Sequence, residues 1–189
     1  MTALATGCPT GGSGGGGDGG GGGGGGNDLA LADVGGEVAK IVCKAMVQCY
    51  GIGGDQASCE AEWTAQFEDQ TQKLWENAVN KGTLQYDGKK MRECLDALAA
   101  GGCTVFADGT TPAACDEALQ GTVDAGGACN VNEECAGDAY CDTNSACPGT
   151  CVAYVAEGGD CSSDSCKPGL DCVNNTCVAK AKVGEACGG

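Results

Sequence analysis

The stretch CNVNEECAGDAYC, residues 129–141, carries three cysteines that are separated by five residues each. CKPGLDCVNNTC, residues 166–177, repeats this arrangement with gaps of five and four residues. Both stretches lie in residues 121–189, which contain ten Cys and one Leu but no Ile, Met, Phe or Trp. So few large apolar side chains cannot form a hydrophobic core. We therefore expect disulfides to stabilise this region, by about 2–4 kcal/mol each.

The same region contains three units that open with similar tetrapeptides, GGAC (126–129), GGDC (158–161) and GEAC (184–187). The ten cysteines divide among the units as Cys129, Cys135, Cys141, Cys147 and Cys151, then Cys161, Cys166, Cys172 and Cys177, then Cys187. Self-similarity of this kind predicts tandem cysteine-rich repeats with little regular structure.

The whole chain has 17 Cys and no His among 189 residues, a content typical of a small disulfide-rich protein in an oxidising compartment. Zinc sites use closely spaced Cys pairs together with further Cys or His residues. The only C-x3-C pair is Cys147 and Cys151, and no C-x-x-C occurs. The spacing therefore favours disulfides, and we expect no metal site and no cofactor.

Residues 37–120 have the pattern of a short helical, disulfide-linked domain. Apolar residues recur at helical spacing from Val38 to Cys49 before Gly51, which predicts a first helix. Asp55 as N-cap and Gly82 after the last turn bound a second helix, and Asp87 caps a third that ends at Gly101–Gly102. A helical turn is expected to follow Thr111–Pro112. The few large aromatic side chains are expected in the core: Trp63, Phe67 and Trp75.

The cysteine count is even in each of these two regions. The helical region holds six, which are Cys43, Cys49, Cys59, Cys94, Cys103 and Cys115. We expect three disulfides within 37–120 and five within 121–189. In the helical region the expected pairs are Cys49–Cys59, Cys103–Cys115 and Cys43–Cys94, one of 15 possible assignments.

Cys8 is the odd cysteine, and it precedes a glycine-rich segment. Between Gly11 and Gly26 only Ser13 and Asp18 are not glycine, so residues 9–36 are expected to form a disordered tether. ALATGC, residues 3–8, resembles the end of a bacterial lipoprotein signal, in which the cysteine becomes acylated. The resemblance implies that residues 1–8 are the remnant of a signal whose start lies upstream. It also implies that Cys8 carries a lipid anchor to the cell envelope, at the outer membrane or cell surface.

The cysteine-rich stretches 129–141 and 166–177 resemble the N-terminal cysteine-rich domain of the Dickkopf family over about 60 residues. The chain differs from that family in lacking a vicinal Cys pair and in the length of its middle gaps. No receptor-contact motif is visible, so Wnt-receptor binding does not transfer. Over its whole length, including YDG and ECLDALAAGGC, the chain is similar to predicted cysteine-rich lipoproteins of myxobacterial type.

A formal net charge of -16 excludes several partners. Nucleic acid and anionic lipid would both be repelled, so membrane contact is expected through the anchor alone. Acidic residues could line a calcium site at Glu133, Glu134, Asp138 and Asp142, although the twelve-residue loop of an EF-hand is missing.

The sequence thus predicts a surface-anchored, disulfide-stabilised protein that is structural or binds an unidentified protein or envelope partner. The alternative is a secreted inhibitor or ligand module of knottin or colipase style. Enzymatic activity is not expected, because the chain has no His and no nucleophile–base motif, and no free thiol is expected.

Overall fold

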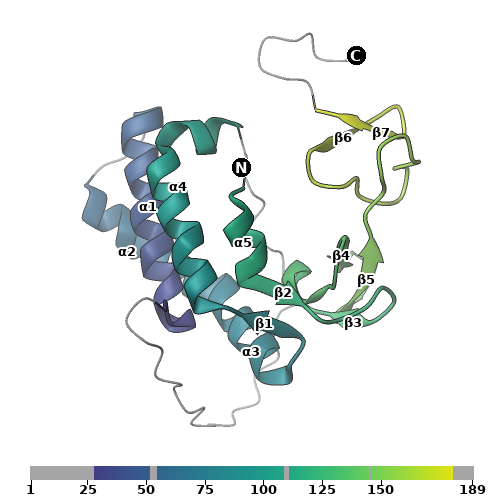
Figure 1. Cartoon of the computed structure of the whole chain (residues 1–189), viewed down its shortest axis with the longest axis horizontal. Helices are drawn as coiled ribbons and strands as arrows, with labels where there is room; N and C mark the ends of the chain where they lie inside the picture. Colours follow the sequence, from purple (N-terminus) through teal and green to yellow (C-terminus); the bar gives the residue numbers. More distant parts are fainter. Residues whose placement is uncertain (1–27, 52–54, 109–110, 145, 181–189) are drawn as a thin grey trace.

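Figure 1 shows the computed structural model, which describes residues 28–51, 55–108, 111–144 and 146–180. Helices occupy the first half of the described chain and short strands the second half (Figure 1). The predicted signal remnant 1–8 with Cys8, most of the predicted tether and Cys187 lie outside the described residues.

Local signals predict most ends of the first helices, but the first helix begins at Val34, inside the predicted tether, and not near Val38. A 3-10 turn, η1 (Leu31–Asp33), leads into α1 (Val34–Tyr50), which ends at Gly51 in the left-handed conformation. Asp55 caps α2 (Gln56–Phe67) by accepting a hydrogen bond from the Ser58 amide, and the helix continues through a π turn, η2 (Glu68–Gln72), into α3 (Lys73–Lys81). Gly82 then ends α3 with a φ of 75°.

The next helix, α4 (Gly88–Asp108), is capped by the Asp87 carboxylate, which accepts hydrogen bonds from the Lys89 and Lys90 amides. The predicted stop at Gly101–Gly102 is a kink, because the helix resumes beyond Gly102. The short helix α5 (Ala113–Ala118) follows Pro112, which serves as its N-cap instead of its first residue.

Residues that precede the predicted tether boundary at 36 belong to the fold. Leu29 is 4% exposed and is part of the helical core, and its amide donates to the Gly88 carbonyl at 3.0 Å. The Tyr86 hydroxyl donates to the Leu29 carbonyl at 2.7 Å. These two hydrogen bonds join Leu29 to residues more than fifty positions away in the sequence.

A two-stranded antiparallel sheet joins distant parts of the helical region and was not predicted. Strand β1 (Leu84–Tyr86) pairs with β2 (Leu119–Gly121), with Gln85 opposite Gln120. The core of the helical region combines apolar residues of α1, α2, α3, β1, α4 and α5 with two from connecting segments: Leu29, Val34, Phe67, Trp75, Ala78, Leu84, Met91, Leu95, Ala118 and Val131. The Phe67 and Trp75 rings meet edge to face at 5.4 Å, as expected of core aromatics, whereas Trp63 is half-buried.

The cysteine-rich region has more regular structure than predicted. In its first part, β3 (Ala128–Cys129), β5 (Gly149–Ala153) and β4 (Ala139–Asp142) form a three-stranded antiparallel sheet in the order β3-β5-β4, with a 3-10 turn, η3 (Asn132–Glu134), before β4. In its second part, β6 (Leu170–Val173) pairs with β7 (Thr176–Ala179). Figure 1 places the two sheets in succession beside the helices.

Two helical glycines are expected to respond in opposite ways to alanine. Gly36 lies inside α1 with open space where a Cβ would lie, so Gly36→Ala should stabilise the fold by about 0.5–1 kcal/mol. Gly102 has φ 51° and ψ -137°, and Gly102→Ala should destabilise by about 1–3 kcal/mol although no atom would obstruct the methyl group. Urea unfolding of both variants checks this. Shifts of the same sign would contradict it.

Candidate functional site: the disulfide framework and its junction with the helices

The six cysteines of the helical region form three disulfides with one another, but the expected pairs are wrong. The bonds are Cys43–Cys59, Cys49–Cys103 and Cys94–Cys115. Cys43 and Cys49 are six residues apart, which separates their side chains by about 120° around α1. Cys43 therefore faces α2 while Cys49 faces α4. Proximity along the chain had suggested Cys49–Cys59, but the direction of each side chain decides the pairing.

In the cysteine-rich region, four disulfides link described residues. The first part contains Cys129–Cys141 and Cys135–Cys151, and the second contains Cys161–Cys172 and Cys166–Cys177. Cys147 is also disulfide-bonded. In both parts the first cysteine bonds to the third and the second bonds to the last, so the order of bonding is the same.

The two parts also have the same pattern of backbone hydrogen bonds. The Gly126 amide donates to the Cys151 carbonyl, and the Cys151 amide donates back to Gly127. In the second part, Gly158 donates to Cys177, and Cys177 donates back to Gly159. A parallel bridge joins Val123 to Cys135, and its counterpart joins Val155 to Cys166. In each unit, the GG pair before the first cysteine thus forms hydrogen bonds with the last cysteine of the unit.

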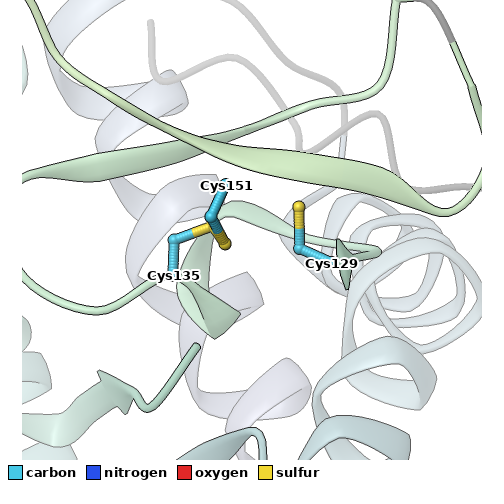
Figure 2. A group of neighbouring side chains, drawn as sticks. All are labelled: Cys129, Cys135 and Cys151. Carbon is cyan, nitrogen blue, oxygen red and sulfur yellow. A yellow bond between two sulfur atoms is a disulfide. The ribbon is translucent and has the colours of Figure 1, made fainter. Parts of the chain in front are cut away.

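Figure 2 shows how closely the sulfur atoms gather in the first unit: Cys129 lies beside the Cys135–Cys151 bond. One ligand atom of each of these three residues lies within 4.8 Å of the others, and Cys161, Cys166 and Cys177 form a similar group. Among the described residues, these are the two groups close enough to hold a metal ion. All six sulfurs are in disulfides, so none is present as the thiolate that metals bind.

The acidic residues considered for calcium do not form a group close enough to hold a metal ion in the described part of the chain. Asp138 pairs with Lys167, and Asp142 accepts hydrogen bonds from the Asn144 backbone and side chain. Glu134 is 2% exposed and bonds to protein donors. Glu134, Asp138 and Asp142 thus each have partners of their own.

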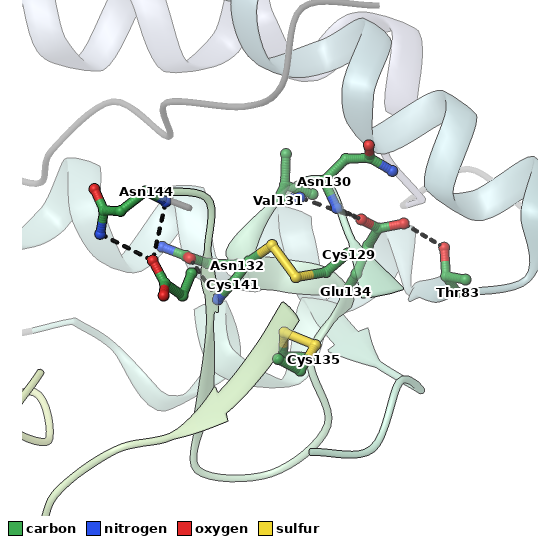
Figure 3. The surroundings of a disulfide bond; sticks show 11 residues. Thr83, Cys129, Asn130, Val131, Asn132, Glu134, Cys135, Cys141 and Asn144 are labelled. Carbon is green, nitrogen blue, oxygen red and sulfur yellow. Dashed lines mark hydrogen bonds between the residues drawn. A yellow bond between two sulfur atoms is a disulfide. The ribbon is translucent and has the colours of Figure 1, made fainter. Parts of the chain in front are cut away.

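Glu134 joins the first cysteine-rich unit to the helices (Figure 3). One carboxylate oxygen accepts a hydrogen bond of 2.6 Å from the Thr83 hydroxyl, which lies between α3 and β1. The other accepts from the Asn130 and Val131 amides. Val131 itself is 2% exposed and packs in the helical core. Because charge-assisted bonds to a buried carboxylate are strong, this junction holds the first unit against the helices.

Glu133, the preceding residue, also turns toward the helical core. Burial raises the pKa of its carboxyl above the ordinary 4.5, an effect opposed by its own backbone amide and by the nearby Trp75 indole. Glu133 Oε2 and Trp75 Nε1 are both buried, and neither has a hydrogen bond of good geometry to a described residue. The ionised form is therefore poorly solvated.

Replacing this carboxyl should change how stability depends on pH. With a raised folded-state pKa, the native protein binds more protons than the unfolded chain between the two pKa values, so stability falls as pH rises through that window. Glu133→Gln should be more stable than wild type at pH 7, and the difference should vanish below about pH 4.5. Urea unfolding at several pH values tests this, with exposed Glu157→Gln as control. A pH-independent difference would contradict it.

The two cysteine-rich units contact each other through side chains. Lys167 pairs with Asp138, and the Ser165 amide donates to the Tyr140 hydroxyl at 3.3 Å. The Tyr140 and Tyr154 rings lie 5.0 Å apart on the first unit. Sequence reasoning missed this interface and the Thr83–Glu134 bond. The N-cap of η3 is Val131, which has no side-chain acceptor, so V-N-E-E carries no capping signal, and nothing in it points to Thr83.

Taken together, the described chain is a small disulfide-stabilised protein of the extracytoplasmic type. No helix in the described ranges is both long enough and apolar enough to cross a membrane. No protein-family model, curated protein or solved structure matches the chain significantly.

Proposed function

We propose that the protein is a surface-anchored lipoprotein of the bacterial cell envelope whose disulfide-linked units display loops to a protein or envelope partner. The observation that carries the proposal is the recurrence of one framework with different loops. Both units keep the same disulfide order and glycine hydrogen bonds. Tandem repeats of this kind present binding loops on a rigid support.

The loops differ between the units although the framework is shared. Between the first two framework cysteines, the first unit carries NVNEE, of which Val131 and Glu134 are buried at the junction with the helices. The second unit carries SSDS, in which all three serines are exposed. Between the strands of each hairpin, the first unit has residues 143–148, whereas the second has only Asn174 and Asn175, both with positive φ. Since disulfides hold the ends of each loop, ordering the loops on binding costs little conformational entropy.

The anchor part of the proposal rests on Cys8 and the glycine-rich segment. Seven disulfides join fourteen of the described cysteines to one another, so none of these fourteen takes Cys8 as its partner. Two or more acyl chains would hold the protein stably in a bilayer at about 0.8 kcal/mol per buried CH2.

Fractionation tests the anchor directly. Expressed from its full reading frame in a bacterial host, the protein should partition into detergent and lose residues 1–7, with a lipid mass on Cys8. A Cys8→Ser variant should move to the aqueous fraction, whereas Ser13→Ala should fractionate as wild type does. An unmodified Cys8 peptide in a protein that fractionates like Cys8→Ser would refute the anchor.

Display of the loops is tested by cross-linking on intact cells. A variant in which Ser162–Ser165 is replaced by glycine and serine should lose a cross-linked partner that the wild type retains. Inhibition of a secreted hydrolase by the same loop would instead support the knottin or colipase alternative. If neither a partner nor an inhibited enzyme depends on any loop, the units serve as a structural spacer. The proposal includes no enzymatic activity of the protein itself.

A further inference from the structure

A cleft of about 340 Å³ opens in the helical domain, away from the cysteine-rich units. Helices α2 and α4 both pack on α1, and the cleft lies between them along one face of α1. Residues four apart share a face of a helix, which is why Lys40, Lys44 and Gln48 follow one another along the cleft. The volume is at the lower end of the range for small-molecule sites, about 300–1,000 Å³.

Much of the cleft lining is apolar. Ala45 is buried, while Ile41, Leu98 and Phe106 are half-buried and so retain surface that a ligand could cover. Leu98 and Phe106 come from the two sides of the kink at Gly102, so the kink shapes the α4 wall. An aliphatic chain would gain from burial here.

The charge at the rim is unusual for a chain with a formal net charge of -16. Most described lysines lie in ion pairs, and Lys40 itself is 2.9 Å from Glu37. Lys44 is exposed at the rim and forms no ion pair with any described residue. Glu60 is the one acidic residue of the lining. The cleft therefore offers an uncompensated cation beside an apolar wall.

From this combination we infer that the cleft binds a small anion with an apolar body, whose head group pairs with Lys44 and whose body lies against Ile41, Leu98 and Phe106. Charge complementarity favours an anion over a cation at this position, because Lys44 forms no ion pair with a described residue and Glu60 is the one acidic residue of the lining. The inference does not depend on the lipid anchor or on display by the cysteine-rich units.

Decanoate serves as the probe, added to the full-length oxidised protein below its micelle concentration. Binding should be saturable, and the NMR amide shifts should concentrate on α1 from Lys40 to Cys49 and on α4 near Leu98. Decanol and decyltrimethylammonium have the same chain without the negative charge. Both should bind more weakly at this position, because neither forms the charge-assisted bond to Lys44.

Three variants distinguish binding in the cleft from general attraction to a lysine. Lys44→Gln should weaken decanoate binding by about tenfold. Lys81→Gln removes the same charge from another unpaired lysine, at the end of α3, and should leave binding unchanged. Ala99→Glu, at an exposed lining position, should also weaken binding without unfolding the protein. Equal effects of Lys44→Gln and Lys81→Gln, shifts spread over the whole surface, or no saturable binding would each overturn the inference.

Discussion

Glu134→Ala should destabilise the protein by about 3 kcal/mol, because it leaves buried donors without an acceptor. The carboxylate is 2% exposed and accepts from the Thr83 hydroxyl and from the Asn130 and Val131 amides. Without it, the first cysteine-rich unit should also separate more easily from the helices. Urea unfolding measures the loss, and hydrogen exchange at Val131 should show the local opening.

Glu134→Gln tests whether hydrogen bonds or charge hold the junction. The Gln carbonyl can accept from the two backbone amides while its NH2 group donates to Thr83 Oγ1. The Thr83 hydroxyl hydrogen can then turn to the Ala78 carbonyl, which lies 3.1 Å away. We therefore expect a loss of about 1 kcal/mol or less.

Glu157→Ala is the matched control for Glu134→Ala, since it removes the same charge from an exposed site. Its effect should stay within about 0.5 kcal/mol. If Glu134→Ala and Glu157→Ala change stability equally, Glu134 does not hold the junction.

Removing the Cys49–Cys103 bond should cost about 4 kcal/mol, because its cysteines are 54 residues apart and the bond restricts the unfolded chain strongly. Neither cysteine is buried, so a Cys49→Ala/Cys103→Ala variant should leave no core cavity. The loss would then reflect loop closure alone. Urea unfolding of the oxidised proteins measures it.

A second double variant on the same two helices controls for the alanine substitutions themselves. Gln48 and Thr104 are exposed neighbours of the two cysteines, and Gln48→Ala/Thr104→Ala should change stability by less than about 0.5 kcal/mol. Peptide mapping under non-reducing conditions should recover Cys49 joined to Cys103. A Cys49–Cys59 peptide would show the pairing to be wrong, and a loss below about 1 kcal/mol would contradict the loop-closure account.

The sequence was enough to predict helix caps and helix ends that depend on residues within one turn. Asp55 and Asp87 cap helices, and Gly51 and Gly82 end them, because each effect needs only the residue and its neighbours within four positions. The reliance of residues 121–189 on disulfides was equally predictable, since composition alone shows that they lack apolar bulk.

Cysteine pairing, by contrast, depends on tertiary structure. Cys43 and Cys49 are close in sequence but point to different neighbouring helices, so the choice between Cys59, Cys94 and Cys103 depends on how α2 and α4 pack on α1. Sequence spacing gives no information about that packing, and six cysteines allow 15 pairings.

Composition and local motifs were thus enough to predict capped helices followed by cysteine-rich units that disulfides hold together. They did not predict that Leu29 enters the core, that β1 pairs with β2, or that Glu134 bonds to Thr83. Each of these contacts joins residues more than thirty positions apart. Caps and composition act locally, whereas a long-range contact forms only where the packing of intervening elements offsets the entropy of closing the chain between its partners.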